Sequence, residues 1–189
     1  KVMMALLLTM RGTPFLYYGE EIGMRDIRLK RKEILDPLGK KYYPFHKGRD
    51  GCRSPMQWDD SENAGFSTGE PWLPVHHNYP SRNLAAQQAD EDSLFNLTRG
   101  LIALRKKYPV LRRGSFTALK DVPRATLGFL RQEQHNTILV ILNFSAKKKN
   151  FPLPERNWEV LLSTYRGEEK IEQELILFPN EVLLLKEVK

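Results

Sequence analysis

The feature that most constrains the fold of this chain is a change of sequence character near Ser115. From there to the C-terminus, short runs of strand type recur, and turn-forming residues such as His135-Asn136 and Pro179-Asn180 separate them. Strands are predicted at Ser115–Leu119, Leu127–Arg131, Ile138–Asn143, Asn150–Leu153, Trp158–Ser163, Glu174–Phe178 and Val182–Lys186. Many strands at such short spacing indicate an antiparallel β-sandwich.

The residues before Gly114 follow a different pattern. Val2–Met10 is an apolar run that predicts a buried helix, and the sequence Gly12-Thr13-Pro14 breaks it. The next run, Phe15–Tyr18, is short, aromatic and of strand type. A helix, a tight break and a fully apolar strand indicate a parallel sheet covered by helices. We therefore expect two domains, with the boundary near Gly114.

The stretch from residue 25 to residue 92 is rich in Gly, Pro, Asp and Asn, but it also contains many aromatic residues. It is too aromatic for disorder, and a loop of this length in a compact domain is usually functional. We interpret it as an ordered excursion that covers a site. An amphipathic helix over Leu94–Tyr108 follows, with basic residues at Arg105–Lys107 that suit its C-terminal end, and Pro109 ends it.

Composition and charge exclude several classes of function. The net charge is +7, but the basic residues are scattered and do not alternate with aromatic residues, so a solvated surface is favoured over nucleic-acid binding. No apolar run reaches the roughly 18 residues that span a bilayer, so no membrane partner is expected. A single cysteine, Cys52, excludes an intrachain disulfide and favours a cytoplasmic location. Because the chain lacks an initiator Met, we expect it to be part of a larger protein.

The most chemically suggestive segment is the loop Gly48–Asp59. It contains Arg49, Asp50 and Arg53 among glycine and proline residues. A guanidinium group binds planar acceptors through paired hydrogen bonds and stays charged at any working pH, so it can orient carboxylates and hold sugar hydroxyls. The alternative is a structural ion pair, Arg49 with Asp50 or Arg53 with Asp59. From spacing alone, the structural alternative is favoured, since most ion pairs are structural.

Blocks of sequence in a fixed order resemble the α-glucosidase and oligo-1,6-glucosidase branch of glycoside hydrolase family 13. The blocks are Gly12-Thr13-Pro14, Tyr17–Met24, Asp36–Gly39, Gly48–Trp58 and Asn63–Ser67. This resemblance implies the C-terminal end of a (β/α)8 barrel followed by an antiparallel β-sandwich, that is, an α/β domain over residues 1–114 and an all-β domain over residues 115–189. Phe15–Tyr18 would be the eighth barrel strand, and barrel active sites lie at the C-terminal ends of the strands.

The resemblance also implies a function for the whole protein, namely retaining hydrolysis of terminal α-linked glucose from short oligosaccharides. The three acids of that mechanism, an Asp nucleophile, a Glu acid/base and a second Asp, lie upstream of this chain, so the chain alone is expected to be inactive. Arg53 matches the arginine that contributes to the glucose pocket, with Arg49 and Asp50 in supporting roles. Glu20 and Glu21 are interpreted as support for the barrel mouth. No cofactor or metal is expected.

Aromatic and histidine residues of the long loop have both a structural and a functional interpretation. Trp58, Phe66 and Trp72 could stack on sugar rings, but packing inside the loop is favoured because large aromatic residues usually serve as apolar anchors. His76-His77 lacks acidic or cysteine neighbours at ligand spacing, so both are interpreted as ordinary loop residues.

Three other functions stay open. A trehalose synthase or sucrose isomerase would share the block around Arg53, and a non-catalytic heavy chain of an amino-acid transporter would share the fold. A carbohydrate-binding module alone is the least favoured, because no exposed aromatic platform is evident in the predicted sandwich. The choice between α-1,4 and α-1,6 linkage is also left open by these residues.

Overall fold

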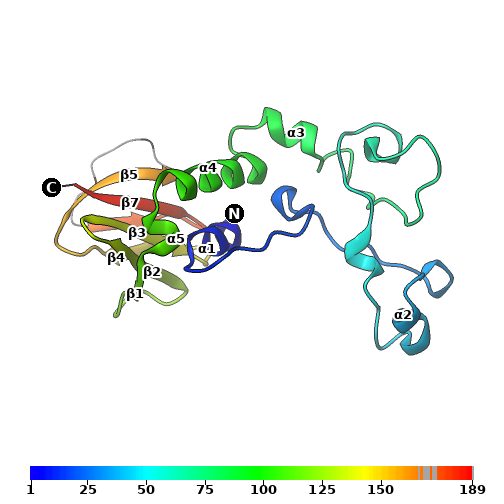
Figure 1. The fold of residues 1–189 in the computed structure, drawn as a ribbon, viewed down its shortest axis with the longest axis horizontal. Coiled ribbons are helices and arrows are strands. Elements are labelled where there is room, and N and C mark those ends of the chain that lie inside the picture. The colour runs from blue at the N-terminus through cyan, green and yellow to red at the C-terminus, as the bar shows by residue number, and fades with distance from the viewer. Residues whose placement is uncertain (166, 168–170, 172–173, 189) are drawn as a thin grey trace. The chain divides into compact units, whose positions relative to one another are not determined.

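The computed structural model describes residues 1–165, 167, 171 and 174–188, and Figure 1 labels their helices and strands. The chain forms two compact units, which we call the sheet unit (Lys1–Phe15 with Leu97–Lys189) and the loop unit (Leu16–Asn96). The two units follow packing rather than sequence order, since the first helix belongs with the C-terminal sheets. Separate domains at residues 1–114 and 115–189 stay a prediction.

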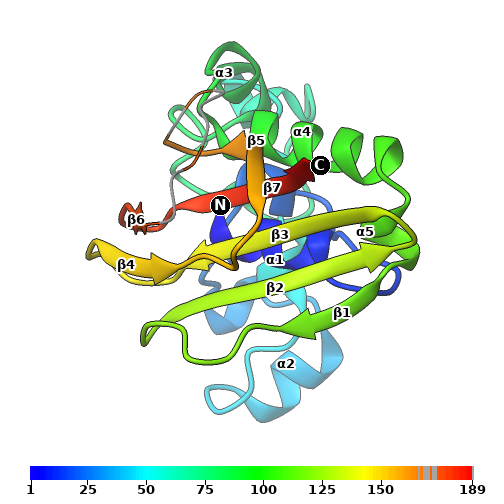
Figure 2. The same ribbon diagram turned by 90° about the vertical axis from the view of Figure 1, so that its left-hand side faces the viewer.

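The sheet unit contains every strand that the turn pattern predicts. The strands are β1 (Ser115–Ala118), β2 (Thr126–Glu133), β3 (Asn136–Asn143), β4 (Lys149–Pro152), β5 (Asn157–Ser163), β6 (Glu174–Leu177) and β7 (Val182–Val188). One sheet has five strands in the order β1-β2-β3-β7-β5, and β4 pairs with β6 in a second sheet (Figure 2). All pairs are antiparallel, as predicted.

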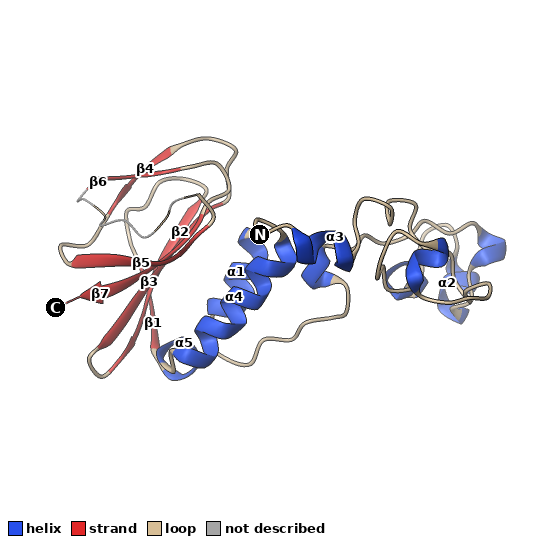
Figure 3. Cartoon of the chain, turned by 90° about the horizontal axis from the view of Figure 1, so that it is seen from above, coloured by secondary structure: helices blue, strands red, loops and turns tan. Residues whose placement is uncertain are grey.

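The central strand β3 is buried on both faces, which explains its nearly continuous apolar sequence. One face shares a core with the small sheet, where Leu139 and Ile141 belong to the same cluster as Phe151 of β4 and Leu175 of β6. The other face of the large sheet is covered by helices (Figure 3). Both faces of β3 are therefore shielded from water.

Helices α1 (Val2–Thr9), α4 (Leu94–Lys107) and α5 (Val110–Arg113) provide that cover. The predicted helix at Val2–Met10 is confirmed, and it buries one side while Met3 on the other side is 67% exposed. Pro109 ends α4 as expected, but it also precedes a short helix that the sequence reading missed. The N–H groups in the first turn of a helix have no acceptor within the helix. Proline, which lacks an N–H, therefore suits the start of a helix.

Two buried arginines connect these helices to the sheet. Arg105 of α4 donates hydrogen bonds to the carbonyls of Leu8 (2.8 Å), Met10 (3.1 Å), Gly12 and Leu111 (2.8 Å). Arg131 of β2 donates to the carbonyls of Thr9, Leu111 (2.8 Å), Gly114 (2.9 Å) and Ser115 (3.0 Å). Carbonyls at the C-terminal ends of α1 and α5, which carry partial negative charge, thus receive positive partners. Burial lowers the pKa of both guanidinium groups.

The predicted strand at Phe15–Tyr18 is wrong as a description of this structure. Residues 15–17 have no regular secondary structure, Tyr18 lies in a turn, and Phe15 is 84% exposed. A strand needs hydrogen bonds to a neighbouring strand, and no described residue offers such a partner here. The sequence pattern indicates that the run is apolar, as a buried strand would be. It does not show whether another strand lies beside the run.

The rest of the loop unit is an ordered path with little regular structure, as the aromatic composition predicts. It contains α2 (Pro37–Tyr42) and α3 (Leu84–Ala89), with short 3-10 turns at Glu20–Ile22, Arg31–Glu33, Asp50–Arg53 and Glu62–Gly65. Among the described residues, every helix of the molecule is too short or too polar to reach across a lipid bilayer.

Candidate functional site

A cavity of about 340 Å³ lies within the loop unit, where the segment after Tyr18 meets the Gly48–Asp59 loop. Its lining combines one cation, one carboxylate and several large aromatic or apolar side chains. The lining residues are Tyr18, Glu21, Arg53, Ser54, Pro55, Met56, Trp58, Phe66 and Trp72. Its volume falls at the lower end of the range of about 300–1,000 Å³ that is typical of small-molecule sites.

Arg53 is the cationic group of this cavity. It ends the 3-10 turn Asp50–Arg53 and is half-buried, and the buried residues 54–57 hold the backbone that follows it. Within the described part of the chain, its guanidinium group has no hydrogen bond and no ion pair. The sequence alternative, an ion pair with Asp59, does not form, because Asp59 accepts hydrogen bonds from Ser61 instead. Among the described residues, the Arg53 guanidinium therefore lines the cavity with its donors unpaired.

Tyr18 joins the two segments that form the cavity. Its hydroxyl donates a hydrogen bond to the Ser54 carbonyl at 2.9 Å, directly beside Arg53. Burial raises the pKa of Tyr18, and its neighbour Tyr17 adds to that effect while Arg53 opposes it. The hydroxyl therefore stays protonated at neutral pH and serves as a donor that fixes the loop.

Arg49 and Asp50 lie next to Arg53 in sequence but outside the cavity lining. Asp50 is buried, and its Oδ2 accepts the backbone N–H groups of Leu35 (2.6 Å) and Asp36 (2.7 Å). Arg49 pairs with Asp36 rather than with Asp50, at 2.9 Å from Nη2 to Oδ1. The expected Arg49–Asp50 pair is thus wrong, and both residues instead tie the Arg53 loop to the segment before α2.

Asp36 is the residue at which these connections meet, and sequence reasoning assigned it no role. It caps α2 by accepting the Gly39 N–H at 3.2 Å, and it also accepts the Arg49 N–H at 3.3 Å. Gly48 has a φ of +70°, and a Cβ there would lie 2.5 Å from Asp36 Oδ2, so only glycine fits. The Asp-Pro pair before a helix was the available signal, since Asp favours the N-cap and Pro the next position.

The structure corrects the expectation that Trp58, Phe66 and Trp72 pack inside the loop. Their exposed fractions are 47%, 44% and 56%, and all three line the cavity. The loop is anchored by polar groups instead: Gln57 is fully buried, and its Nε2 donates to Asn78 Oδ1 at 3.2 Å and to the Arg82 carbonyl. Because amides hold the loop, its aromatic side chains remain available at the surface.

The two acidic residues that follow Tyr18 have different surroundings. Glu20 accepts the Tyr17 N–H at 3.1 Å and so stabilises the local turn; its support of a barrel mouth stays a prediction. Glu21 is half-buried and lines the cavity, which the sequence reading did not distinguish from Glu20. It is the one carboxylate among the described lining residues, whereas glycoside hydrolysis needs a pair.

The remaining candidates lie outside this cavity. Cys52 is exposed, and its thiol donates to the Arg49 carbonyl at 3.1 Å. The rings of His76 and His77 stack at 4.3 Å, and His76 Nδ1 accepts the Asn78 N–H. Among the described residues, no three His, Cys, Asp or Glu side chains are gathered as a metal site would need.

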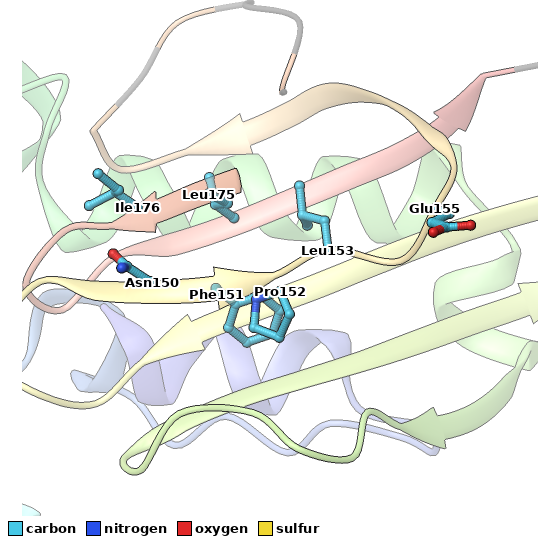
Figure 4. A pocket seen from close by; sticks show the side chains of 7 residues that line it. All are labelled: Asn150, Phe151, Pro152, Leu153, Glu155, Leu175 and Ile176. Atoms are coloured by element: carbon cyan, nitrogen blue, oxygen red, sulfur yellow. The ribbon is translucent and has the colours of Figure 1, made fainter. Parts of the chain in front are cut away.

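A second cavity, of about 510 Å³, lies in the sheet unit against strands β4 and β6 (Figure 4). Figure 4 shows Phe151 and Pro152 on one of these strands and Leu175 and Ile176 on the other. Asn150 and Glu155 are its polar groups, and no cation is present among the described lining residues. The Arg53 cavity combines guanidinium donors with exposed aromatic faces. It is therefore better suited to an uncharged polyol than the cavity against β4 and β6.

The sequence and fold of this chain correspond to a known class of protein. The family model described as "Alpha amylase, catalytic domain" matches residues 1–114. This chain therefore belongs to the α-amylase family, glycoside hydrolase family 13, and the resemblance noted in its sequence is confirmed.

Individual relatives agree with this placement. The oligo-1,6-glucosidase of Parageobacillus thermoglucosidasius is 35% identical over 98% of this chain and 37% of its own length. The trehalose-6-phosphate hydrolase of Bacillus subtilis is 32% identical over 100% of this chain and 38% of its own length. The crystal structure of trehalulose synthase MutB from Pseudomonas mesoacidophila has a TM-score of 0.86 at 31% identity, over 98% of this chain and 37% of that one. The chain thus spans little more than a third of the length of these relatives.

Proposed function

We propose that the whole protein is a retaining α-glucosidase that removes terminal α-linked glucose from short oligosaccharides, and that this chain contributes Arg53 to the binding of that glucose. The observation that carries the proposal is the unpaired guanidinium of Arg53 at a cavity with aromatic walls, in a chain of this family. Hydrogen bonds from a charged donor to sugar hydroxyls accelerate the reaction when they strengthen in the transition state.

The proposal assigns the bond-breaking chemistry to residues that precede this chain in the whole protein. Retaining hydrolysis uses two carboxyl groups about 5 Å apart, one as nucleophile and one as acid/base. The Arg53 cavity supplies only Glu21 among its described lining residues. Arg49 and Asp50 act by positioning, since they hold the loop that carries Arg53.

The proposed architecture follows from the same assignment. Residues 1–114 would complete a (β/α)8 barrel, in which the unpaired run Phe15–Tyr18 gains a neighbouring strand, and residues 115–189 would form a β-sandwich domain. The apolar, exposed side chains of this run are the support for that partner. An exposed, unpaired Cys52 favours the cytoplasm as the compartment.

Kinetics of Arg53 variants in the full-length protein test the proposal. We expect Arg53→Ala to lower kcat/KM for isomaltose and maltose about 100-fold, because a charged hydrogen bond contributes roughly 1.5–3 kcal/mol. Arg53→Lys should recover only part of this loss, since lysine lacks the planar pair of donors. Thermal melting should change little, because the Arg53 side chain has no partner in the described chain.

Arg124→Ala is the matched control, since Arg124 is exposed and belongs to the sheet unit. Its kcat/KM should equal that of the wild type. A folded Arg53→Ala protein that keeps its activity within about threefold would show that Arg53 does not bind the substrate.

Isomerisation of sucrose is a second candidate, because a trehalulose synthase structure matches this chain with a TM-score of 0.86. Product analysis separates the two. Hydrolysis of sucrose releases glucose and fructose, whereas isomerisation yields a new disaccharide. The relatives named above all carry enzyme names, so no observation favours a transporter heavy chain.

A further inference from the structure

The positive charge of this chain is concentrated in one stretch of the loop unit. Residues 25–53 contain ten Lys or Arg residues and four Asp or Glu residues, so their net charge of +6 accounts for almost all of the +7 of the whole chain. Two of the four acids, Asp36 and Asp50, are buried and accept hydrogen bonds from within the stretch. The surface of this stretch therefore carries an excess of positive charge.

A third cavity, of about 660 Å³, lies within this basic stretch. Residues from two segments, 26–34 and 43–52, line it, and it shares no residue with the described lining of the Arg53 cavity. Its volume lies within the range of about 300–1,000 Å³ that is typical of small-molecule sites. The cavity is therefore large enough for a small molecule and has a lining of its own.

Each of the two segments contributes one cation to this cavity. Arg28 comes from the first segment and Lys47 from the second, and both side chains are exposed. Within the described chain, neither has a hydrogen bond or an ion pair, although Asp26 also lines the cavity. Two unpaired cations beside one carboxylate leave the described lining with a net positive charge. Because both cations face one hollow, their attraction for an anion adds up there.

Backbone contacts hold the two segments in place. The Ile27 N–H donates to the Gly51 carbonyl at 3.0 Å. A Cβ at Gly51 would lie 3.2 Å from the Ile27 carbonyl oxygen, so the two backbones approach closely at this point. The N–H groups of Phe45 and His46 both bind the Tyr42 carbonyl, at 2.9 and 3.0 Å, which fixes the turn in the second segment. This backbone presents both cations before a ligand binds, which lowers the entropy cost of binding.

We propose that this cavity binds a small phosphate ester, with Arg28 and Lys47 on the phosphate group. A guanidinium binds phosphate oxygens through paired hydrogen bonds, and an ammonium adds a point charge. A phosphate monoester carries a charge of about −1.5 to −2 at pH 7, which two cations match. Tyr43 of the lining is 41% exposed and offers an aromatic face to the organic part of the ester.

Titration calorimetry on the full-length protein tests the site with two probes, phenyl phosphate and inorganic phosphate. We expect phenyl phosphate to bind more tightly, because its ring contacts Tyr43. Arg28→Gln and Lys47→Gln should each weaken the binding of both probes about tenfold, since each removes a charged hydrogen bond. Tyr43→Ala should weaken the binding of phenyl phosphate alone. Without ligand, Arg28→Gln and Lys47→Gln should melt at the temperature of the wild type, because neither side chain has a partner in the described chain.

Lys40→Gln is the matched control, because Lys40 is an exposed cation of the same basic stretch outside the cavity lining. Its affinity for both probes should stay within about twofold of the wild type. Equal losses in Lys40→Gln and Lys47→Gln would show a general attraction to the basic surface and would overturn the cavity as a site. A wild-type protein that binds no phenyl phosphate up to about 10 mM would overturn it as well. Neither result would bear on the hydrolysis of α-glucosides.

Discussion

Asp36 shows how one side chain can organise the loop that carries a functional residue. Its carboxylate caps α2, pairs with Arg49 and accepts the Arg49 N–H, while its own N–H binds Asp50. The hydrogen bond from Arg49 holds the pKa of Asp36 below its ordinary value of 3.8, against the opposing effect of burial. The charged form of Asp36 is therefore favoured by folding.

This shift predicts how the stability of the whole protein depends on pH. Because the pKa of Asp36 is depressed in the folded state, its stabilising effect is complete above the ordinary pKa and disappears as the pH falls through the folded-state pKa. We expect the melting temperature of Asp36→Asn to lie below that of the wild type by a constant amount from pH 7 to about pH 5. The difference should shrink below about pH 4.

Arg49→Gln provides the control for this titration. Without the guanidinium partner, the folded-state pKa of Asp36 moves toward its ordinary value, so the pH-dependent loss should be smaller and should be complete at a higher pH. If the gap between the wild type and Asp36→Asn stayed the same down to pH 2.5, the Asp36 carboxylate would not be the titrating group.

Residues differ in how far their roles could be predicted from sequence. Arg53 could be selected from the order of blocks around it, but its lack of an ion pair could not, because Asp59 is close in sequence and turns away to Ser61. The same limit applies to Arg49, whose partner is Asp36 rather than the adjacent Asp50. Neighbouring positions say little about side-chain pairing in a loop without regular periodicity.

At the scale of elements, the junction of α1, α5 and the large sheet depends on buried cations. Arg105 was predicted only as one of three basic residues that favour the end of α4, yet it is buried and binds carbonyls from two segments, residues 8–12 and Leu111. Arg131 is fully buried, next to the buried apolar residues Phe129 and Leu130 of β2. In the hydrogen bonds described, neither Arg105 nor Arg131 binds a carboxylate. Backbone carbonyls near the helix ends accept their hydrogen bonds instead.

We expect Arg131→Met to destabilise the protein by roughly 3 kcal/mol or more. The variant keeps much of the side-chain volume but leaves buried carbonyls unpaired, and each unpaired acceptor costs about 1–3 kcal/mol. Denaturant unfolding, followed by circular dichroism, measures this loss. Arg124→Met on the exposed surface should fall within about 0.5 kcal/mol of the wild type. Equal stability of the two variants would contradict the proposed importance of the junction.

Helices and strands were largely predictable where the same sequence pattern recurs along the chain, as in the C-terminal strands. The strands β1 to β7 were all anticipated within a few residues of their observed ends, because short runs of strand type separated by turn residues leave a local signature. Phe15–Tyr18 has the same composition as a strand but no partner, so the local signature alone misassigned it. The turn at Asn63–Gly65 left no such signal, since Ala64 has a φ of 58°, which is uncommon for a residue with a Cβ.

For the molecule as a whole, we expect the 189 residues alone to release no glucose from isomaltose above the rate in buffer. The physical reason is that the Arg53 cavity contains a single carboxylate among its described lining residues, whereas hydrolysis needs two. A coupled glucose assay on the purified chain, with the full-length protein as positive control, measures this. Glucose release by the 189-residue chain would show that a second carboxylate of this chain reaches the site.

The sequence by itself determined the family, the number of the C-terminal strands and their positions along the chain, and the choice of Arg53 as the residue to test. These depend on local patterns, which short-range sterics and burial impose residue by residue. Only the tertiary structure decided that Arg53 is unpaired, that Arg105 and Arg131 are buried, and that Trp58, Phe66 and Trp72 face a cavity. Those properties depend on which distant segments meet, as when Tyr18 binds Ser54 or Asp50 binds Leu35, and local sequence does not encode such meetings.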